Sequence, residues 1–213
     1  MKAAMPTSPT AILQSGIEQL GLTLAAPALP QLLAYQDQLI KWNGAYNLTA
    51  IRDPAEMTIK HLLDSLTLLP YVHGRVLDVG AGAGLPGIVL AIANPALNVT
   101  TLDSNGKKAR FMRHAARTLN LVNVNVIEGR VEAVPATERY DCIVSRAFAS
   151  LADFFDKTAH LLDVGGVWVA MKGKLDAKEV ADIPANVEIR ETRRLRVPGL
   201  NEERHAVFAT LKK

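Results

Sequence analysis

The clearest candidate for chemistry in this sequence is the glycine-rich segment VLDVGAGAGLPG, residues 76–87. Its glycines fit two overlapping patterns. Gly80, Gly82 and Gly84 form G-x-G-x-G, whereas Gly82, Gly84 and Gly87 form G-x-G-x-x-G. Glycines in a turn between a strand and a helix let a ligand approach the backbone, and the helix N–H groups then point at its polar atoms. The first pattern indicates a methyl donor and the second a dinucleotide hydride carrier.

Two acidic residues help to choose between these cofactors. Asp103 lies roughly 20 residues past the turn, where an acid can hold ribose hydroxyls; both candidate cofactors contain adenosine, so Asp103 fits either. Asp78 lies inside the predicted first strand, and a buried carboxylate needs a partner, such as the ammonium group of S-adenosylmethionine. Pro86 fixes a helix start soon after Gly84, which leaves Gly87 for close packing of helix on sheet. These residues favour the methyl donor.

The elements that must position these residues change character after residue 74. Residues 1–70 are predicted to be helical, with helices that begin at Pro9, Pro30 and Pro54 and end near Gly21, Gly44 and Pro70. From residue 71 onward, short apolar strands alternate with helices, which indicates βαβ units and a parallel sheet. These strands are predicted at 76–79, 99–102, 124–127, 142–144 and 167–171. We expect Gly165 and Gly166 to close a helix over 151–162.

The C-terminal tail has a different pattern. The segments VEIRETRRLRV and HAVFATL read as two strands joined by a loop that contains Pro198 and Gly199. We expect them to form an antiparallel pair at one edge of the sheet. The predicted architecture is therefore an α/β sheet domain, residues 71–213, on which a helical extension, residues 1–70, packs.

Composition sets further limits on the class of protein. The chain has 213 residues, of which 49% are apolar, which is enough for one sizeable core. No apolar run approaches the roughly 18 residues of a membrane span. The single cysteine, Cys142, cannot form an internal disulfide. We therefore expect a cytoplasmic protein with no membrane contact and no metal ion.

The charge distribution leaves two readings open. The net charge is only +3, but SNGKKARFMRHAAR and RETRRLRV are locally basic. Charge runs of this kind are often solvated surfaces. They also suit RNA, because phosphates require several Lys and Arg side chains on one surface.

Several segments together resemble the bacterial RsmG family, also called GidB, of 16S ribosomal RNA guanine-N7 methyltransferases. The resemblance runs along nearly the whole chain, through KWNGAYNLTAIRDPAEM, HLLDSL, LDVGAGAGLPGIVLAI, TLDSNGKKARFM, RVEAVP, YDCIVSRAFASL, MKGK and VPGLNEERH. It implies a class I S-adenosylmethionine-dependent methyltransferase (Rossmann-like) sheet with a helical N-terminal extension. It also implies methylation of guanine N7 at position 527 of 16S ribosomal RNA.

The resemblance extends to individual site residues. It places Gly80 and Leu85 against the methyl donor, Asp103 at its ribose, Val131 and Glu132 at its adenine, and Arg146 at its methionine end or at the target base. The glycine loop adds Asp78, Gly82 and Gly84 to the predicted cofactor site. For Arg146, a structural salt bridge is the alternative reading. No general base is expected, since N7 of guanine carries a lone pair and no proton.

Basic residues near the predicted strand ends are candidates for contacts with 16S ribosomal RNA or the small ribosomal subunit. They are Lys107, Lys108, Lys172, Lys174, Arg193, Arg194 and Arg204. We expect a monomer. Two other functions fit parts of the pattern: an NAD(P)-dependent oxidoreductase that uses the second glycine pattern, and a non-catalytic RNA-binding protein on a methyltransferase fold.

Overall fold

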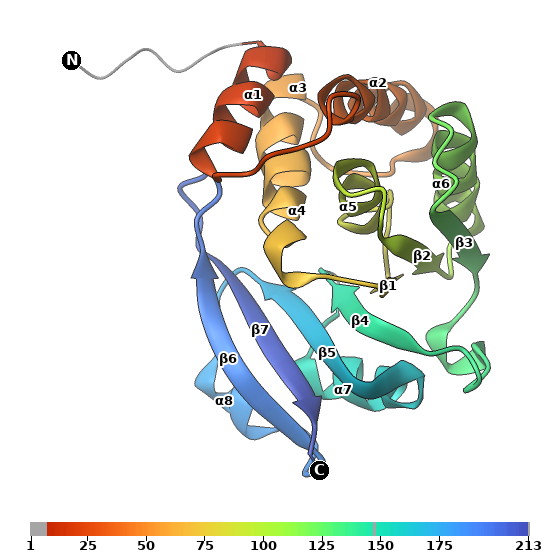
Figure 1. Ribbon diagram of the computed structural model, residues 1–213, viewed down its shortest axis with the longest axis vertical. Coiled ribbons are helices and arrows are strands. Elements are labelled where there is room, and N and C mark those ends of the chain that lie inside the picture. Colours follow the sequence, from red (N-terminus) through yellow and green to blue (C-terminus); the bar gives the residue numbers. More distant parts are fainter. Residues whose placement is uncertain (1–7, 147, 213) are drawn as a thin grey trace.

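A seven-stranded sheet forms the centre of the protein in the computed structural model, which describes residues 8–146 and 148–212. The strand order is β3-β2-β1-β4-β5-β7-β6 (Figure 1). The strands are β1 Arg75–Val79, β2 Asn98–Asp103, β3 Val124–Glu128, β4 Tyr140–Ser145, β5 Leu162–Lys172, β6 Val187–Leu195 and β7 Arg204–Leu211. The first five strands pair in parallel, and β7 pairs antiparallel with both β5 and β6. The predicted parallel sheet and its antiparallel C-terminal edge are confirmed.

Helices cover both faces of this sheet (Figure 1). They are α1 Pro9–Gln19, α2 Ala28–Tyr46, α3 Pro54–Met57, α4 Asp64–Leu66, α5 Gly87–Ala93, α6 Gly106–Thr118, α7 Leu151–Thr158 and α8 Ala177–Ala181. Helices α5 and α6 lie on one face together with α1 to α4, and α7 and α8 lie on the other. Among the described residues, none of the helices has the length and apolar character of a membrane span.

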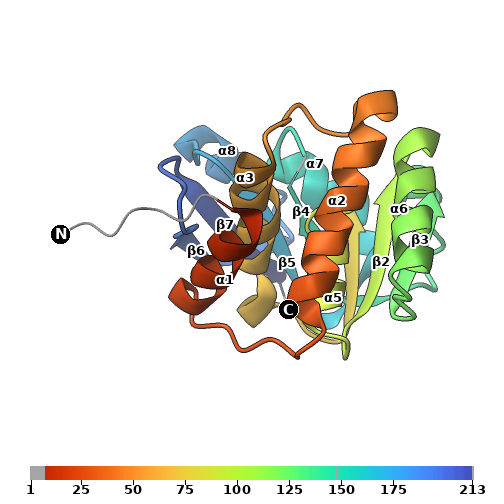
Figure 2. The same ribbon diagram turned by 90° about the horizontal axis from the view of Figure 1, so that it is seen from above.

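Helix α5 is buried on all sides, which explains why its sequence, GIVLAIA, has no polar face. The sheet covers one side of α5, and α2 and α4 cover the other. Seen from above, α2 lies over α5 and beside α6 (Figure 2). One apolar cluster therefore joins residues of α1, α2 and α4 to residues of α5 and α6.

The predicted helix starts are confirmed where a side chain caps the helix. Ser8 Oγ accepts a hydrogen bond from the Ala11 N–H at 3.2 Å, and Asp53 Oδ1 accepts one from the Glu56 N–H at 2.7 Å. The predicted bounds of the second helix are wrong, because α2 begins before Pro30 and passes through Gly44. A glycine inside a helix costs only about 1 kcal/mol, which packing on α5 offsets.

A further expectation about local structure is wrong, and another element is present but irregular. Gly165 and Gly166 lie inside β5 and do not close a helix, because α7 ends at Thr158 and Leu162 already pairs with β4. The helix predicted after Asp53 is present over residues 54–66, but its hydrogen-bond pattern changes along its length. Between α3 and α4, residues Thr58–Leu63 form a π-helical segment, a distortion that is frequent at functional sites.

Gly87, the first residue of α5, lies against β1 and β2. A Cβ atom at this position would lie 2.8 Å from Asp78 Oδ2 and 2.8 Å from Thr101 Cγ2. Both contacts are shorter than real side-chain contacts, so only glycine lets α5 lie this close to the sheet. The predicted packing role of Gly87 is confirmed.

We predict that Gly87→Ala lowers the free energy of unfolding by about 1–3 kcal/mol, because the added methyl group forces α5 away from the sheet. Gly44→Ala is the matched control. It adds the same methyl group inside α2, where nothing lies within 4 Å of the new Cβ, and it should raise stability by about 0.5–1 kcal/mol. Urea unfolding measures both. Equal stability of Gly87→Ala and wild type would contradict the packing role.

Candidate active site

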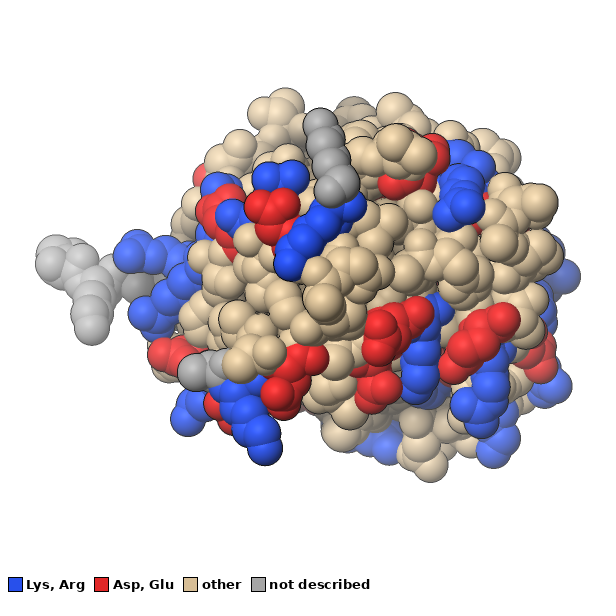
Figure 3. All heavy atoms as spheres, turned by 90° about the horizontal axis from the view of Figure 1, so that it is seen from below, with Lys and Arg blue, Asp and Glu red and all other residues tan. Residues whose placement is uncertain are grey.

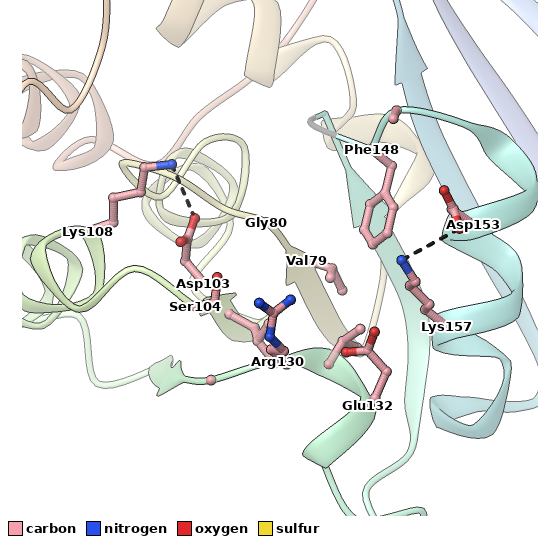
Figure 4. A pocket seen from close by; sticks show the side chains of 14 residues that line it. Val79, Gly80, Asp103, Ser104, Lys108, Arg130, Glu132, Phe148, Asp153 and Lys157 are labelled. Atoms are coloured by element: carbon pink, nitrogen blue, oxygen red, sulfur yellow. Dashed lines mark ion pairs between the residues drawn. The ribbon is translucent and has the colours of Figure 1, made fainter.

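A cavity of about 370 Å³, the first cavity, opens at the carboxyl ends of the parallel strands, where α/β folds bind their ligands. Val79 and Gly80 lie at its base, with Asp103 on one side and Phe148 on the other (Figure 4). Of the predicted cofactor residues, it brings together Gly80, Asp103, Val131 and Glu132.

The loop after β1 takes a backbone conformation that suits glycine. Gly80, Gly82 and Gly84 have φ values of +70°, +62° and +92°. The N–H groups of Gly80 and Ala81 both donate to the carbonyl of Leu102, at 2.9 and 3.0 Å, so the loop turns back over the end of β2. The G-x-G-x-G pattern is thus explained by three residues in the left-handed region.

Asp103 is held at the end of β2 by two backbone hydrogen bonds. Its Oδ2 accepts from the Gly82 N–H and its Oδ1 from the Asn105 N–H, both at 2.9 Å. Lys108 Nζ lies 3.7 Å from Oδ2 (Figure 4). A carboxylate oxygen can accept more than one hydrogen bond, so Asp103 keeps acceptor capacity toward the first cavity. Lys108, which the sequence suggested for RNA, lines this cavity instead of a separate surface.

Asp78 does not line the first cavity. Its side chain is fully buried, and Oδ2 accepts a hydrogen bond from the Gly87 N–H at 2.7 Å. Burial raises the pKa of Asp78 to about 7, while the Gly87 hydrogen bond and the charge of Arg146 act in the opposite direction. Oδ1 has no hydrogen-bond partner among the described residues. Asp78 therefore ties β1 to α5, and its predicted contact with an ammonium group stays a prediction.

The other predicted loop residues shape the turn rather than the cavity wall. Gly82 donates to Asp103, Gly84 donates to the Ala81 carbonyl at 2.8 Å, and Leu85 is 3% exposed. None of the three belongs to the lining of the first cavity.

Arg146, just after β4, lines a second cavity of about 370 Å³ together with Lys60, His61, Asp64 and five further residues, Ile51, Met171, Lys172, Gly173 and Arg204. Arg146 Nη1 donates to the Lys60 carbonyl at 3.1 Å and lies 3.4 Å from Asp64 Oδ2. The salt bridge that the sequence left open is thus present. The predicted RNA-contact residues Lys172 and Arg204 also lie here.

The remaining predicted RNA-contact residues lie apart. Lys107 and Lys174 are exposed. Arg193 is paired with Glu191 at 2.7 Å and lies over the ring of Tyr71, 4.9 Å from its centre. Arg194 has a side chain that is 67% exposed. On the face that Figure 3 shows, basic and acidic side chains alternate, so that face offers no continuous basic surface.

Sequence reasoning missed several residues of the first cavity: Ser104, Arg130, Phe148, Asp153 and Lys157. Arg130 and Phe148 could have been found, because each follows a predicted strand and lies within two residues of a residue that was chosen. Asp153 and Lys157 reach the cavity from α7, where their side chains form an ion pair of 3.5 Å (Figure 4). No sequence signal shows that α7 presents this face to the cavity.

Solved structures place this fold in a known class. The crystal structure of TrmN from Thermus thermophilus matches with a TM-score of 0.56 and 21% identity, over 70% of this chain and 47% of that chain. A SAM-dependent methyltransferase from Aquifex aeolicus matches with a TM-score of 0.56 and 17% identity, over 75% of this chain and 94% of that chain. Together with the strand order, these two matches show that the protein has the class I S-adenosylmethionine-dependent methyltransferase fold.

Sequence comparison narrows the class to one family. A family model described as "GidB: rRNA small subunit methyltransferase G" matches residues 28–207. The ribosomal RNA small subunit methyltransferase G of Neisseria gonorrhoeae is 52% identical over 92% of this chain and 95% of its own length. That of Stenotrophomonas maltophilia is 51% identical over 97% of both. The chain belongs to the GidB family. Membership of this family does not favour the oxidoreductase or the non-catalytic RNA-binding protein as its function.

The raised pKa of Asp78 predicts a pH-dependent contribution to stability. The carboxyl group of an unfolded chain has a pKa of about 3.9, so between about pH 4 and pH 7 the folded protein binds a proton that the unfolded chain does not. Stability should therefore fall as pH rises through this range, by up to about 1.4 kcal/mol per pH unit. Asp78→Asn keeps an acceptor for Gly87 and should remove this slope.

The measurement is the difference in unfolding free energy between wild type and Asp78→Asn, at pH 5, 6, 7 and 8. Burial and Arg146 lower the pKa of His61 to about 4, which gives a slope of the opposite sign below about pH 6.5. Because both proteins contain His61, its effect cancels in the difference. A difference that does not change with pH would show that Asp78 stays ionised.

Proposed function

We propose that this protein transfers a methyl group from S-adenosylmethionine to N7 of a guanosine in 16S ribosomal RNA, at position 527 by resemblance to its family. The observation that supports this proposal most strongly is the family match over residues 28–207. The first cavity supports it, because Gly80 and Asp103 meet there at the ends of β1 and β2. The protein is proposed to act on the RNA or the small ribosomal subunit as a monomer in the cytoplasm.

The residues of the first cavity fit an adenosine group. Asp103, fixed by two backbone N–H groups, has acceptors for the two ribose hydroxyls. Val131 and Glu132, in the short helical turn after β3, form a wall for the adenine ring. Gly80 lets the ligand lie against the backbone. Gly82, Gly84 and Leu85 hold the loop in shape. Asp78 Oδ1 is proposed to meet the amino-acid end of the cofactor, and Arg146, which lines the second cavity, is proposed to face the target base.

For methyl transfer to guanine N7, the main task of the protein is to align the two reacting groups. When bound, S-adenosylmethionine supplies a methyl group on a sulfonium, which is an excellent leaving group. The protein must hold N7 in line with the methyl group and exclude water, and such positioning supplies much of the rate in reactions of this kind. N7 has no proton to lose, so no residue is needed as a general base. The methylated base carries a positive charge, which a nearby carboxylate can stabilise.

RNA contacts are proposed for the basic residues that the sequence identified. Lys107, Lys174 and Arg194 are exposed and can reach phosphates without breaking short ion pairs. Arg193 would exchange its pair with Glu191 for a phosphate. Lys108, Lys172 and Arg204 line the two cavities. We propose that these three act near the target nucleotide.

The direct test uses ribosomal RNA or small subunits from cells that lack this protein. The purified protein is incubated with them and labelled S-adenosylmethionine, and the label is mapped by cleavage at N7-methylguanine. We expect label at a single guanosine of 16S ribosomal RNA. Label on another base, on protein, or on no ribosomal substrate would overturn the proposal.

Asp103→Ala should weaken S-adenosylmethionine binding at least roughly tenfold, because even one lost hydrogen bond to a charged acceptor costs about 1.5–3 kcal/mol. Isothermal titration calorimetry measures the dissociation constant. Asp37→Ala is the matched control, since Asp37 is exposed on α2 and outside the first cavity. Unchanged affinity of Asp103→Ala would remove Asp103 from the cofactor site.

A further inference from the structure

The second cavity lies beside the first, at the same edge of the sheet. The segment after β4 separates them: Arg146 lines the second cavity, whereas Phe148 and Ala149 line the first. Lys172, at the end of β5, lines the second cavity and donates to the carbonyl of Phe148 at 3.2 Å. A group transferred out of the first cavity across this segment would therefore arrive in the second.

A buried ion cluster is built into the wall of the second cavity. The side chain of Asp64 is only 2% exposed and lies between two arginines, with Oδ2 3.4 Å from Arg146 Nη1 and Oδ1 3.3 Å from Arg204 Nε. The three residues come from α4, the end of β4 and the start of β7. A carboxylate buried this deeply must be paired, so Asp64 helps to hold both guanidinium groups. Arg204 is also held by the Glu203 carbonyl at 2.8 Å and by Glu202 at 3.1 Å.

The π-helical segment before α4 contributes to the same wall. It contains Lys60, whose carbonyl accepts from Arg146 Nη1 at 3.1 Å, and His61, whose Nε2 lies 2.8 Å from Thr49 Oγ1. Arg146 is therefore held through Nη1 alone. Its Nε and Nη2 have no hydrogen-bond partner among the described residues, which leaves one edge of the guanidinium group available to a ligand.

The two cavities differ in the charged residues that line them. The first is lined by Asp103, Glu132 and Asp153 and by as many basic residues, Lys108, Arg130 and Lys157. The second is lined by one acidic residue, Asp64, and four basic residues, Lys60, Arg146, Lys172 and Arg204. Three of these basic residues are already paired with carboxylates: Lys60 with Glu56 and Glu202, Lys172 with Glu179, and Arg204 with Glu202 as well as Asp64. The second cavity therefore offers a ligand one guanidinium edge, that of Arg146, which can bind an RNA phosphate or a carbonyl oxygen. Its volume of about 370 Å³ is in the range of small-ligand pockets.

Building on the proposed function, we propose that the second cavity receives the target guanosine, turned out of the RNA, and that Asp64 is a positioning residue that holds Arg146 and Arg204 around it. The reaction limits how arginine can hold the base. An arginine usually binds guanine through O6 and N7 together, but N7 must stay free to accept the methyl group. The guanidinium group of Arg146 therefore binds the phosphate or O6 and leaves N7 facing the first cavity.

Gly173→Leu tests this by filling the second cavity. Gly173 lines it, and a Cβ there would lie 3.9 Å from its nearest neighbours, Arg204 Nη1 and the Glu203 carbonyl oxygen, so the added Cβ atom meets no clash. We expect methylation of 16S ribosomal RNA to fall at least 20-fold, while calorimetry gives an S-adenosylmethionine affinity within threefold of wild type. Gly44→Leu, which adds the same side chain at an open position of α2, should methylate normally.

The outcomes separate this inference from the proposed function. If wild type fails to methylate the RNA, the proposed function is wrong. If wild type and Gly173→Leu methylate at similar rates, only the assignment of the second cavity is wrong. Loss of S-adenosylmethionine binding in Gly173→Leu would also contradict it, because the second cavity would then belong to the cofactor.

Asp64→Asn tests the same cavity without adding bulk. The amide keeps the shape of the side chain but removes the charge that holds both arginines. We expect the single-turnover rate at saturating RNA and S-adenosylmethionine to fall at least tenfold, measured well below the melting temperature of the variant. A purely structural role would lower the melting temperature and leave this rate within twofold of wild type, and that result would overturn the positioning role.

Discussion

The carboxylate of Asp78 lies fully buried inside the central strand β1, and its hydrogen bond to the Gly87 N–H at 2.7 Å ties that strand to the first turn of α5. A carboxylate in this position is costly unless a donor is close. The helix must therefore start against the strand, at a distance that only glycine permits at residue 87. The loop between them has room only for a tight turn, which accounts for the left-handed glycines and for the two N–H groups on the Leu102 carbonyl.

The N-terminal helices complete this arrangement. Because α5 is apolar on every side, it would expose a hydrophobic face to water if α2 and α4 did not cover it. The Tyr35 hydroxyl also donates to the Ala83 carbonyl at 2.6 Å, so α2 holds the glycine loop from outside the sheet domain. The same region supplies Asp64 and His61 to the second cavity. The helical extension thus lines the second cavity as well as forming part of the core.

The sequence predicted those features that depend on local pattern. Strand positions followed from short apolar runs, the cap at Ser8 from residue type, and the glycine turn from its spacing. Features that depend on tertiary packing could not be found this way. Asp64 and Arg146 are far apart in the chain, and nothing in either segment indicates that they meet. Gly165 and Gly166 were assigned to a helix end because glycine is common there, although the partner strand β4 decides their conformation. The π-helical turn likewise has no signature in the sequence.

The charges around the two cavities bear on product release as well as binding. Guanine is neutral before methylation and cationic afterwards. In the arrangement we propose, the new charge arises beside two arginines, and two like charges about 5 Å apart repel by roughly 3 kcal/mol at an effective dielectric constant of about 20. Asp64 offsets part of that repulsion, because its carboxylate lies between the two guanidinium groups. The transition state, where the charge is only partly developed, is then tolerated, while the fully charged product is held less tightly than the substrate. The two arginines thus favour the departure of the methylated RNA, and the carboxylate between them limits the repulsion while the charge develops.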